Sequence, residues 1–338
     1  MPFRRQEREL PRLFVVLPCF NEEEVLPETA SRLKAALTDL ADRSLISRDS
    51  RILFVNDGSA DKTWELIENL HAQDAVFQGL CLSRNCGHQN ALAAGLFAAA
   101  RICDITVSMD ADLQDDIGVV EKMVEKYREG ADVVYGVRSD RNTDTLFKRT
   151  SAECFYRLMN KMGANTVYNH ADCRLMSSRA LEALMQFGEV NLFLRGLVPM
   201  VGFPSAVVEY ERHERFAGKS KYPLSKMLHF AAEGITSLSV RPIRMITGLG
   251  FGIFFVSIAV LIYSLVRYFT GHTIPGWTTT VLSVWAIGGL IMISLGIIGE
   301  YTGKIYLESK RRPRYIVSDY LGDDGDDPVL ADRCGIVS

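Results

Sequence analysis

The segment Ile105-Thr-Val-Ser-Met-Asp110-Ala-Asp112-Leu-Gln114 joins an apolar run directly to two carboxylates spaced two residues apart. The run has the length of a buried strand. In an extended backbone, side chains at i and i+2 point to one side, which would bring Asp110 and Asp112 together. Two or three hard oxygen ligands at one point suit Mg²⁺ or Mn²⁺, which keep open positions for phosphate oxygens. The segment therefore predicts a strand that ends at a metal and phosphate site.

Similar apolar runs lie on both sides of this segment and alternate with stretches of helical pattern. Repeated β–α units of this kind predict an α/β, Rossmann-like fold with a mostly parallel sheet covered by helices. Ligands of such sheets bind at the carboxyl ends of the strands. The expected strands cover residues 13–17, 52–55, 79–82, 105–109 and 133–135, and the expected helices cover residues 25–40, 63–72, 89–101 and 119–129.

Polar clusters follow three of these strands on the same expected edge of the sheet. They cover residues 18–22, 56–61 and 110–116. Each cluster also has a simpler interpretation, since Asn56-Asp-Gly-Ser59 is typical of a turn, and Asp61 or Asp112 could cap the helix that follows. Their coincidence on one edge favours a binding site.

Several other enzyme classes lack their motifs in this sequence. No GxGxxG follows the first strand, which disfavours a dinucleotide-binding enzyme, and no GxSxG is present for a Ser-His-Asp hydrolase. Gly218-Lys-Ser220 resembles the end of a P-loop, but His213 stands where the first glycine is required. The net charge of −3 gives no basic field for nucleic acid. None of the seven cysteines forms a CxxC pair, so we expect reduced thiols in a cytosolic domain.

The average composition, 48% hydrophobic and 23% charged, conceals a long apolar segment. From Met245 to Gly299 the only charged residue is Arg267. The runs 245–266 and 278–299 would each form a helix of ~33 Å, enough to cross a hydrocarbon core of ~30 Å. Two buried core helices are the alternative. We expect two transmembrane helices, which excludes a simple soluble enzyme, a polytopic transporter and a disordered chain.

Charges around this segment predict its orientation. Basic residues gather outside the two runs, so the positive-inside rule predicts a multi-pass protein of the inner or cell membrane, with its catalytic domain and both termini in the cytoplasm. Leu224–Ser239 has an apolar stripe of helical period, typical of a helix in the membrane interface or of one packed on the domain. Gly248-x-x-x-Gly252 permits close helix packing and is compatible with a homo-oligomer. The expected parts are a charged tail (1–10), a globular domain (11–222), an interfacial helix (223–242), the membrane segment (243–304) and a basic, then acidic, tail (305–338).

The polar clusters resemble the sequence blocks of one enzyme family, the family-two glycosyltransferases of GT-A fold. The blocks are Pro18-Cys-Phe-Asn-Glu22, Val55-Asn-Asp-Gly-Ser59 and Asp110-Ala-Asp-Leu-Gln114, and the resemblance continues through residues 132–138, 172–176, 191–196 and 215–223. With the two expected spans, residues 11 to 316 are similar to the polyprenyl-phosphate glycosyltransferases of the bactoprenol glucosyltransferase type. These are related to dolichol-phosphate mannose synthase.

The resemblance implies a role for each matching position. Asp172 would act as the catalytic base. Alternatively it would orient the acceptor, the sugar or Arg174, because a phosphate monoester with a second pKa of about 6 is already a nucleophile at pH 7. Cys173 stands where the family usually has phenylalanine. The implied nucleotide-sugar residues are Pro18, Phe20, Glu22, Asp57, Asp110, Ala111 and Asp112; the implied metal ligands are Asp110, Asp112 and Gln114; and the implied phosphate-binding residues are Arg138, Arg212, Arg215, Lys219 and Lys221, which could instead meet lipid headgroups.

The implied reaction is the metal-dependent transfer, with inversion, of a hexose from a nucleotide sugar to undecaprenyl or another polyprenyl phosphate at the cytoplasmic membrane face. The resemblance favours UDP-glucose as donor, with GDP-mannose and other UDP-sugars as alternatives. A processive polysaccharide synthase is less favoured, because two spans cannot enclose a polymer channel and no QxxRW occurs. A non-catalytic membrane scaffold is disfavoured by the presence of Asp110, Asp112 and Asp172.

Overall fold

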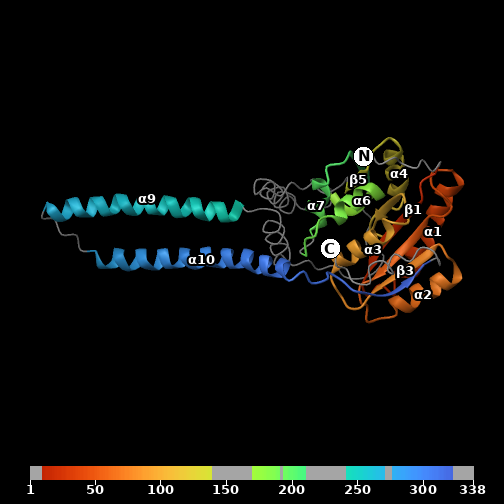
Figure 1. Ribbon diagram of the computed structural model, residues 1–338, viewed down its shortest axis with the longest axis horizontal. Coiled ribbons are helices and arrows are strands. Elements are labelled where there is room, and N and C mark those ends of the chain that lie inside the picture. The colour runs from red at the N-terminus through yellow and green to blue at the C-terminus, as the bar shows by residue number, and fades with distance from the viewer. Residues whose placement is uncertain (1–9, 139–169, 191–192, 211–240, 271–275, 323–338) are drawn as a thin grey trace. The chain divides into compact units, whose positions relative to one another are not determined.

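The computed structural model describes residues 10–138, 170–190, 193–210, 241–270 and 276–322. In these residues the chain forms an eight-stranded sheet with the order β7-β5-β6-β4-β1-β2-β3-β8. Figure 1 labels β1, β3 and β5 of this sheet. β1 pairs in parallel with β2 and β4, and β2 pairs in parallel with β3, which confirms the predicted α/β fold with a mostly parallel sheet. The strands are β1 (Leu13–Cys19), β2 (Arg51–Asn56), β3 (Phe77–Leu82), β4 (Ile105–Ser108), β5 (Val133–Arg138), β6 (His170–Ser177), β7 (Ser205–Tyr210) and β8 (Val317–Leu321).

Helices cover both faces of the sheet. On one face, alternate residues of β1 such as Leu13 and Val15 join a core formed with α1, α2 and α4. On the other face α3 packs closely on the strands, because Gly95 has no side chain there; an added Cβ would lie 2.5 Å from the side chains of Val16 and Val55. The helices of this unit are α1 (Leu26–Asp42), α2 (Thr63–Gln73), α3 (His88–Ala99), α4 (Val119–Arg128), α6 (Ser178–Met185) and α7 (Leu194–Met200).

Strand β6, which the sequence does not predict, returns a distant part of the chain to the centre of the sheet. It runs antiparallel to β4, with Arg174 opposite Ser108. The beginning of β6 therefore lies at the same edge as the carboxyl ends of β1, β2 and β4. β5 and β7 run in the same direction as β4, so Arg138 and Tyr210, the last residues of these strands, also belong to this edge.

The chain also returns to the sheet after its long apolar helices. β8 pairs antiparallel with β3, and the hydroxyl group of Tyr320 donates to Gln78 Oε1 at 3.2 Å. The sequence predicts a tail over residues 305–338. Five of these residues form β8 instead, because Leu321 packs against the core at the edge of the sheet.

Two long helices, α9 (Arg241–Phe269) and α10 (Trp277–Ser309), form a second unit and contact each other. They contain the predicted spans 245–266 and 278–299. By length and hydropathy, the described residues hold one candidate membrane span, Ile287–Ser309, and none of it is buried within the protein. One candidate is thus found where the sequence predicts two, and the span over 245–266 stays a prediction.

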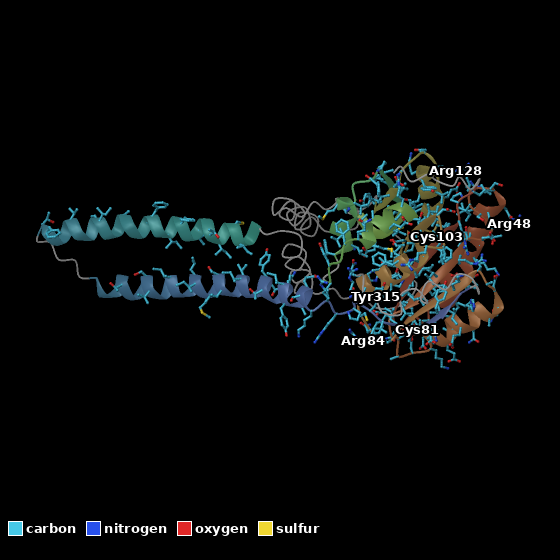
Figure 2. The ribbon with its side chains drawn as sticks, in the orientation of Figure 1. Arg48, Cys81, Arg84, Cys103, Arg128 and Tyr315 are labelled. Atoms are coloured by element: carbon cyan, nitrogen blue, oxygen red, sulfur yellow. The ribbon has the colours of Figure 1, made fainter. Side chains whose placement is uncertain are left out.

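The described cysteines are free thiols, and Cys81 and Cys103, labelled in Figure 2, both belong to the unit built on the sheet. Several sequence predictions fall outside the described residues. These are most of the charged tail 1–10 and of the interfacial helix 223–242, the acidic part of the tail, and Arg212, Arg215, Lys219 and Lys221.

Candidate active site

The loop that follows β4 carries the predicted metal ligands. β4 ends at Ser108, so Asp110 and Asp112 lie in the loop, and the alternation of an extended strand does not place them as predicted. The loop instead turns at Leu113, whose φ is +57°, and the N–H group of Gln114 donates to Asp112 Oδ1 at 3.2 Å. Asp112 therefore helps to hold the loop in shape, and it does not cap α4, whose N-cap residue is Gly118.

Asp110 lies among several other charged groups. Its side chain is 34% exposed. Burial, together with the negative charges of Asp172 and Asp115, raises the pKa of Asp110 to about 6, although His88 acts in the opposite direction. A cation at this position would favour the ionised form of the carboxyl group.

The residues of this loop fit a divalent cation. Within the described ranges, no three His, Cys, Asp or Glu side chains are arranged to hold a metal by themselves. The carboxylates of Asp110 and Asp112 and the amide oxygen of Gln114 are hard ligands, as Mg²⁺ and Mn²⁺ prefer. Mg²⁺ commonly binds one or two carboxylates and completes its coordination with water and substrate phosphates. The loop thus fits an ion that is held jointly with a diphosphate.

Asp172, near the start of β6, pairs with Arg195 in the first turn of α7. Arg195 Nε donates to Asp172 Oδ1 at 3.0 Å, and Nη2 donates to Oδ2 at 2.9 Å. Burial raises the pKa of Asp172, but the neighbouring His88 and Arg195 outweigh this effect and hold the pKa well below its usual range. Asp172 is therefore an ionised carboxylate in a two-bond ion pair.

His88 joins the two acidic parts of the site. It is the first residue of α3, which follows Gly87 at a φ of +88°. Its Nε2 lies 3.7 Å from Asp110 Oδ1 and 3.7 Å from Asp172 Oδ2. Burial lowers the pKa of His88, but these two carboxylates together raise it above its usual value. Both carboxylates thus lie within ion-pair distance of one imidazole group.

The sequence interpretation missed His88 and gave no role to Arg195. A signal for His88 was present, because residues 83–89 follow the third expected strand and are polar, as the other clusters on that edge are. For Arg195 no local signal was available, since its pairing with Asp172 depends on the antiparallel return of β6.

Asp57 holds the loop that leads into His88. Its two carboxylate oxygens accept from the backbone N–H groups of Cys86, at 2.6 Å, and Gly87, at 3.0 Å. Burial raises the pKa of Asp57, and these two hydrogen bonds act against that rise. The next residue, Gly58, has a φ of +64°, and an added Cβ would lie 2.5 Å from the backbone nitrogen of Asn85. The nucleoside contact implied for Asp57 stays a prediction.

Hydrogen bonds join the loop after β1 to the loop after β2, as expected for two parallel strands that end at the same edge of the sheet. The N–H group of Asn21 donates to Ser59 Oγ at 3.0 Å, and the N–H group of Glu22 donates to Thr63 Oγ1 at 2.9 Å. Phe20, in the loop after β1, is 47% exposed, although large aromatic side chains are usually buried. Pro18, in β1, pairs with Val55 in β2.

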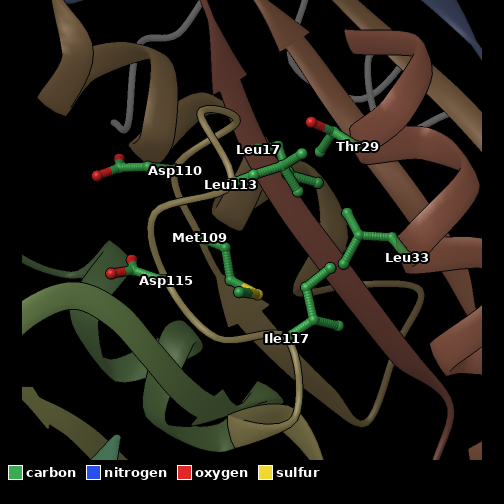
Figure 3. A pocket seen from close by; sticks show the side chains of 8 residues that line it. All are labelled: Leu17, Thr29, Leu33, Met109, Asp110, Leu113, Asp115 and Ile117. Atoms are coloured by element: carbon green, nitrogen blue, oxygen red, sulfur yellow. The ribbon is translucent and has the colours of Figure 1, made fainter. Parts of the chain in front are cut away.

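A small apolar cavity lies beneath the loop after β4. Its volume is about 10 Å³, room for at most one water molecule, so it is a packing feature and not a donor site. In Figure 3 the carboxylates of Asp110 and Asp115 point away from its apolar lining. The buried carbonyl of Ala111 accepts from Thr29 Oγ1 at 2.8 Å, which fixes the loop to α1. The cavity is lined by Leu17, Thr29, Leu33, Met109, Asp110, Leu113, Asp115 and Ile117.

Known proteins resemble this chain over most of its length. The model of the family described as "Glycosyl transferase family 2" matches residues 14–185. The chain is 54% identical to "Uncharacterized glycosyltransferase YkoT" of Bacillus subtilis (strain 168), over 91% of each chain. It is 39% identical to "Bactoprenol glucosyl transferase" of Shigella phage SfV, over 91% of this chain and 98% of the relative. Among solved structures, mannosyl-3-phosphoglycerate synthase from Rubrobacter xylanophilus has a TM-score of 0.46 at 14% identity, covering 70% of this chain and 74% of that one.

Proposed function

This chain belongs to glycosyl transferase family 2 and is a glycosyltransferase of GT-A fold, and on that basis we propose that it transfers glucose from UDP-glucose to a polyprenyl phosphate. The observation that carries the proposal is the meeting of the Asp110 loop with His88 and the Asp172–Arg195 pair at one edge of the sheet. The relatives named bactoprenol glucosyl transferase support the choice of sugar and of acceptor lipid.

The donor would bind along the edge formed by β1, β2 and β4. Phe20 offers an exposed aromatic face to the nucleoside, and Pro18, Glu22 and Asp57 belong to the same edge of the sheet. Asp110, Asp112 and Gln114 would hold Mg²⁺ or Mn²⁺ together with the diphosphate. A divalent cation bound there would neutralise the charge that develops on the departing nucleoside diphosphate.

The acceptor phosphate would approach from the side of β6 and α7. One of its oxygens attacks the anomeric carbon of glucose, and the bond from that carbon to the diphosphate breaks. The electron pair of this bond leaves with UDP, and attack from the opposite side inverts the anomeric carbon. Arg138 ends β5 at this edge, and Arg212, Arg215, Lys219 and Lys221 follow β7 in the chain, so their positive charge would favour an anionic lipid headgroup.

The acceptor lipid places the reaction at a membrane surface. The candidate span Ile287–Ser309 supports membrane attachment. We further propose that α9 provides a second span and that the catalytic domain and both termini lie in the cytoplasm, where nucleotide sugars are made. Basic residues outside the predicted spans 245–266 and 278–299, such as Arg244 and Lys304, support this orientation.

The direct test is transfer of labelled sugar by the purified full-length protein. Undecaprenyl phosphate is supplied in detergent micelles with Mg²⁺ or Mn²⁺, and UDP-glucose, other UDP-sugars and GDP-mannose are compared as donors. The proposal predicts one labelled lipid, formed fastest from UDP-glucose and carrying a single sugar. Faster transfer from GDP-mannose would overturn the donor assignment, and a polymeric product would favour a synthase.

Substitution within the loop tests the metal assignment. Asp112→Asn should lower the rate by at least about 100-fold, because it removes a ligand of the ion that stabilises the leaving group. Asp116→Asn is the matched control, since Asp116 accepts from the N–H group of Gly118 at the far end of the same loop. Full activity of Asp112→Asn would contradict the metal assignment.

A further inference from the structure

The carboxylate of Asp172 is already engaged on both of its oxygens. One side chain, Arg195, donates to Oδ1 and Oδ2 at 3.0 and 2.9 Å, in the parallel geometry that makes such pairs strong. His88 Nε2 lies 3.7 Å from Oδ2 as well. The side chain of Asp172 is only 14% exposed. A proton added to this carboxylate would weaken its ion pair with Arg195.

A further positive charge lies beside this pair. Arg174, two residues along β6, is 3% exposed, and its guanidinium lies over the ring of Tyr135, 5.6 Å from the centroid. Within the described residues, no hydrogen bond is made by its Nε or Nη2. The positive charges of Arg174 and Arg195, together with the contact with His88, favour the ionised form of Asp172, which makes it a poor proton acceptor.

The backbone and the neighbouring helices fix the position of Asp172. Ser108 Oγ donates to the carbonyl oxygen of Asp172 at 2.6 Å, from the last residue of β4. Arg195 comes from α7 and His88 from α3, so one carboxylate joins three elements. A second link between the same two helices is made by Gln89 Oε1, which accepts from the N–H group of Leu194 at 3.3 Å. Asp172 is therefore well placed to fix the positions of the Arg195 and His88 side chains.

The chemistry of the acceptor does not require a base. The second pKa of a phosphate monoester is about 6, so at pH 7 the acceptor is largely a dianion with no proton to remove. When the dianion attacks a UDP-sugar of charge −2, a phosphodiester of charge −1 and UDP of charge −3 result, and no proton is transferred. The barrier includes the repulsion between two approaching anions, and a positioned cation lowers the barrier by reducing this repulsion.

We propose, on the premise of the function proposed above, that Asp172 is a positioning residue that holds Arg195, and that the guanidinium of Arg195 binds the acceptor phosphate. The side chain of Arg195 is 28% exposed, twice the exposure of Asp172. Arg195 is then a catalytic residue of this enzyme, and no side chain acts as general base.

A double-mutant cycle tests this assignment in the full-length protein. Asp172→Asn, Arg195→Ala and the double variant are compared with the wild type by kcat and by KM for undecaprenyl phosphate. Because Asp172 acts through Arg195, each single change should lower kcat/KM by about 100-fold, and the double change should lower it no further. Losses that multiply in the double variant would overturn the proposal.

Two further readouts separate positioning from proton transfer. Guanidinium ion at millimolar concentration should restore part of the activity of Arg195→Ala, but not of the double variant, which lacks the carboxylate to hold it. The wild-type rate should be the same in H₂O and D₂O when the chemical step limits turnover, since no proton is moving. A clear solvent isotope effect on that step, or equal rescue of both variants, would overturn the proposal.

A matched control is available at the other end of β6. Asp132 pairs there with Arg179, which also lies over the ring of Phe203. Arg179→Ala removes a comparable ion pair away from the site and should leave kcat/KM within about twofold. Arg195→Lys, which keeps the charge but loses the two-bond geometry, provides a second variant if Arg195→Ala does not fold.

Binding of farnesyl phosphate, measured by calorimetry, distinguishes a failure of the Arg195 assignment from a failure of the proposed function. If the wild type transfers no sugar to any polyprenyl phosphate, the proposed function fails. The inference still predicts that Arg195→Ala and Asp172→Asn weaken farnesyl phosphate binding at least tenfold, whereas Arg179→Ala does not. Unchanged binding in Arg195→Ala would overturn it.

Discussion

The hydroxyl group of Tyr210 donates a hydrogen bond of 2.7 Å to Oδ1 of Asp115. Both side chains are buried. Tyr210 is the last residue of β7, and Asp115 belongs to the loop that carries Asp110 and Asp112. The bond therefore ties the strand that leads to the basic segment 212–221 to the loop that would hold the donor diphosphate.

Tyr210→Phe should weaken this tie. It removes a donor from a buried carboxylate, so we expect a loss of about 1–2 kcal/mol in the free energy of unfolding, measured by denaturant unfolding of the purified protein. Tyr320→Phe removes a longer hydrogen bond, of 3.2 Å, at the opposite side of the sheet and should cost less. Equal losses in the two variants would contradict the importance of the Tyr210–Asp115 bond.

Metal binding should depend on the ionisation of Asp110. Folding raises its pKa from the ordinary value of 3.8 to about 6, so the folded chain retains the proton to a higher pH than the unfolded chain does. This contribution to stability is complete below pH 3.8 and is lost as the pH rises through 6. A divalent cation binds the ionised form, so Mn²⁺ affinity, followed by calorimetry, should fall as the pH drops below about 6.

Metal binding by the ionised carboxylate also gives a test of whether Asp110 is a ligand of the cation. Mn²⁺ with UDP should raise the melting temperature of the wild type at pH 7.5, and Asp110→Asn should lose this rise, because an amide is a much weaker ligand for a hard cation. Asp116→Asn should keep it. An undiminished rise in Asp110→Asn would exclude Asp110 as a ligand.

Gly58→Ala should disturb the site through the loop before His88. The new Cβ would lie 2.5 Å from the backbone nitrogen of Asn85, and the residue has a φ of +64°, so both a clash and backbone strain arise. We expect a loss of at least about 2 kcal/mol in stability, together with slower sugar transfer. Gly130→Ala provides the control, because Gly130 has a φ of +113° but nothing within 4 Å of an added Cβ. If both variants lose activity equally, strain alone is responsible.

Removal of β8 should destabilise the domain. A chain that ends before residue 315 leaves the edge of β3 unpaired and loses the packing of Leu321, so a loss of about 3 kcal/mol and aggregation are expected. A chain that ends at residue 322 keeps β8 and should melt close to the full-length protein. Size-exclusion chromatography and thermal unfolding distinguish these outcomes, and similar behaviour of the two truncations would contradict a structural role for β8.

The sequence predicts the parallel half of this fold well. β1 to β4 each consist of a short apolar run followed by a polar cluster, and that pattern is local. β6 is harder to predict, because Asp172 and Arg174 interrupt its apolar character and its partners lie far away in the chain. β8 has the exposed residues of an edge strand, so its composition resembles that of a tail.

The site divides in the same way. The clusters around Phe20, Asp57 and Asp110 are found on one edge, as predicted, because parallel strands bring their carboxyl ends together. The Asp172–Arg195 pair and the contacts of His88 depend on three-dimensional packing between α3, β6 and α7. A single charged residue at the start of a helix carries no local signature of its partner, and this is why these two partners of Asp172 were not predicted.

The return of the chain to the sheet at β8 also restricts how many times the chain can cross a membrane. β7 and β8 belong to one sheet, and a sheet cannot lie on two sides of a lipid bilayer at once. The chain between Tyr210 and Val317 must therefore cross a membrane an even number of times. If Ile287–Ser309 crosses, a second crossing is required, and α9 is the long apolar helix that the described chain offers for it.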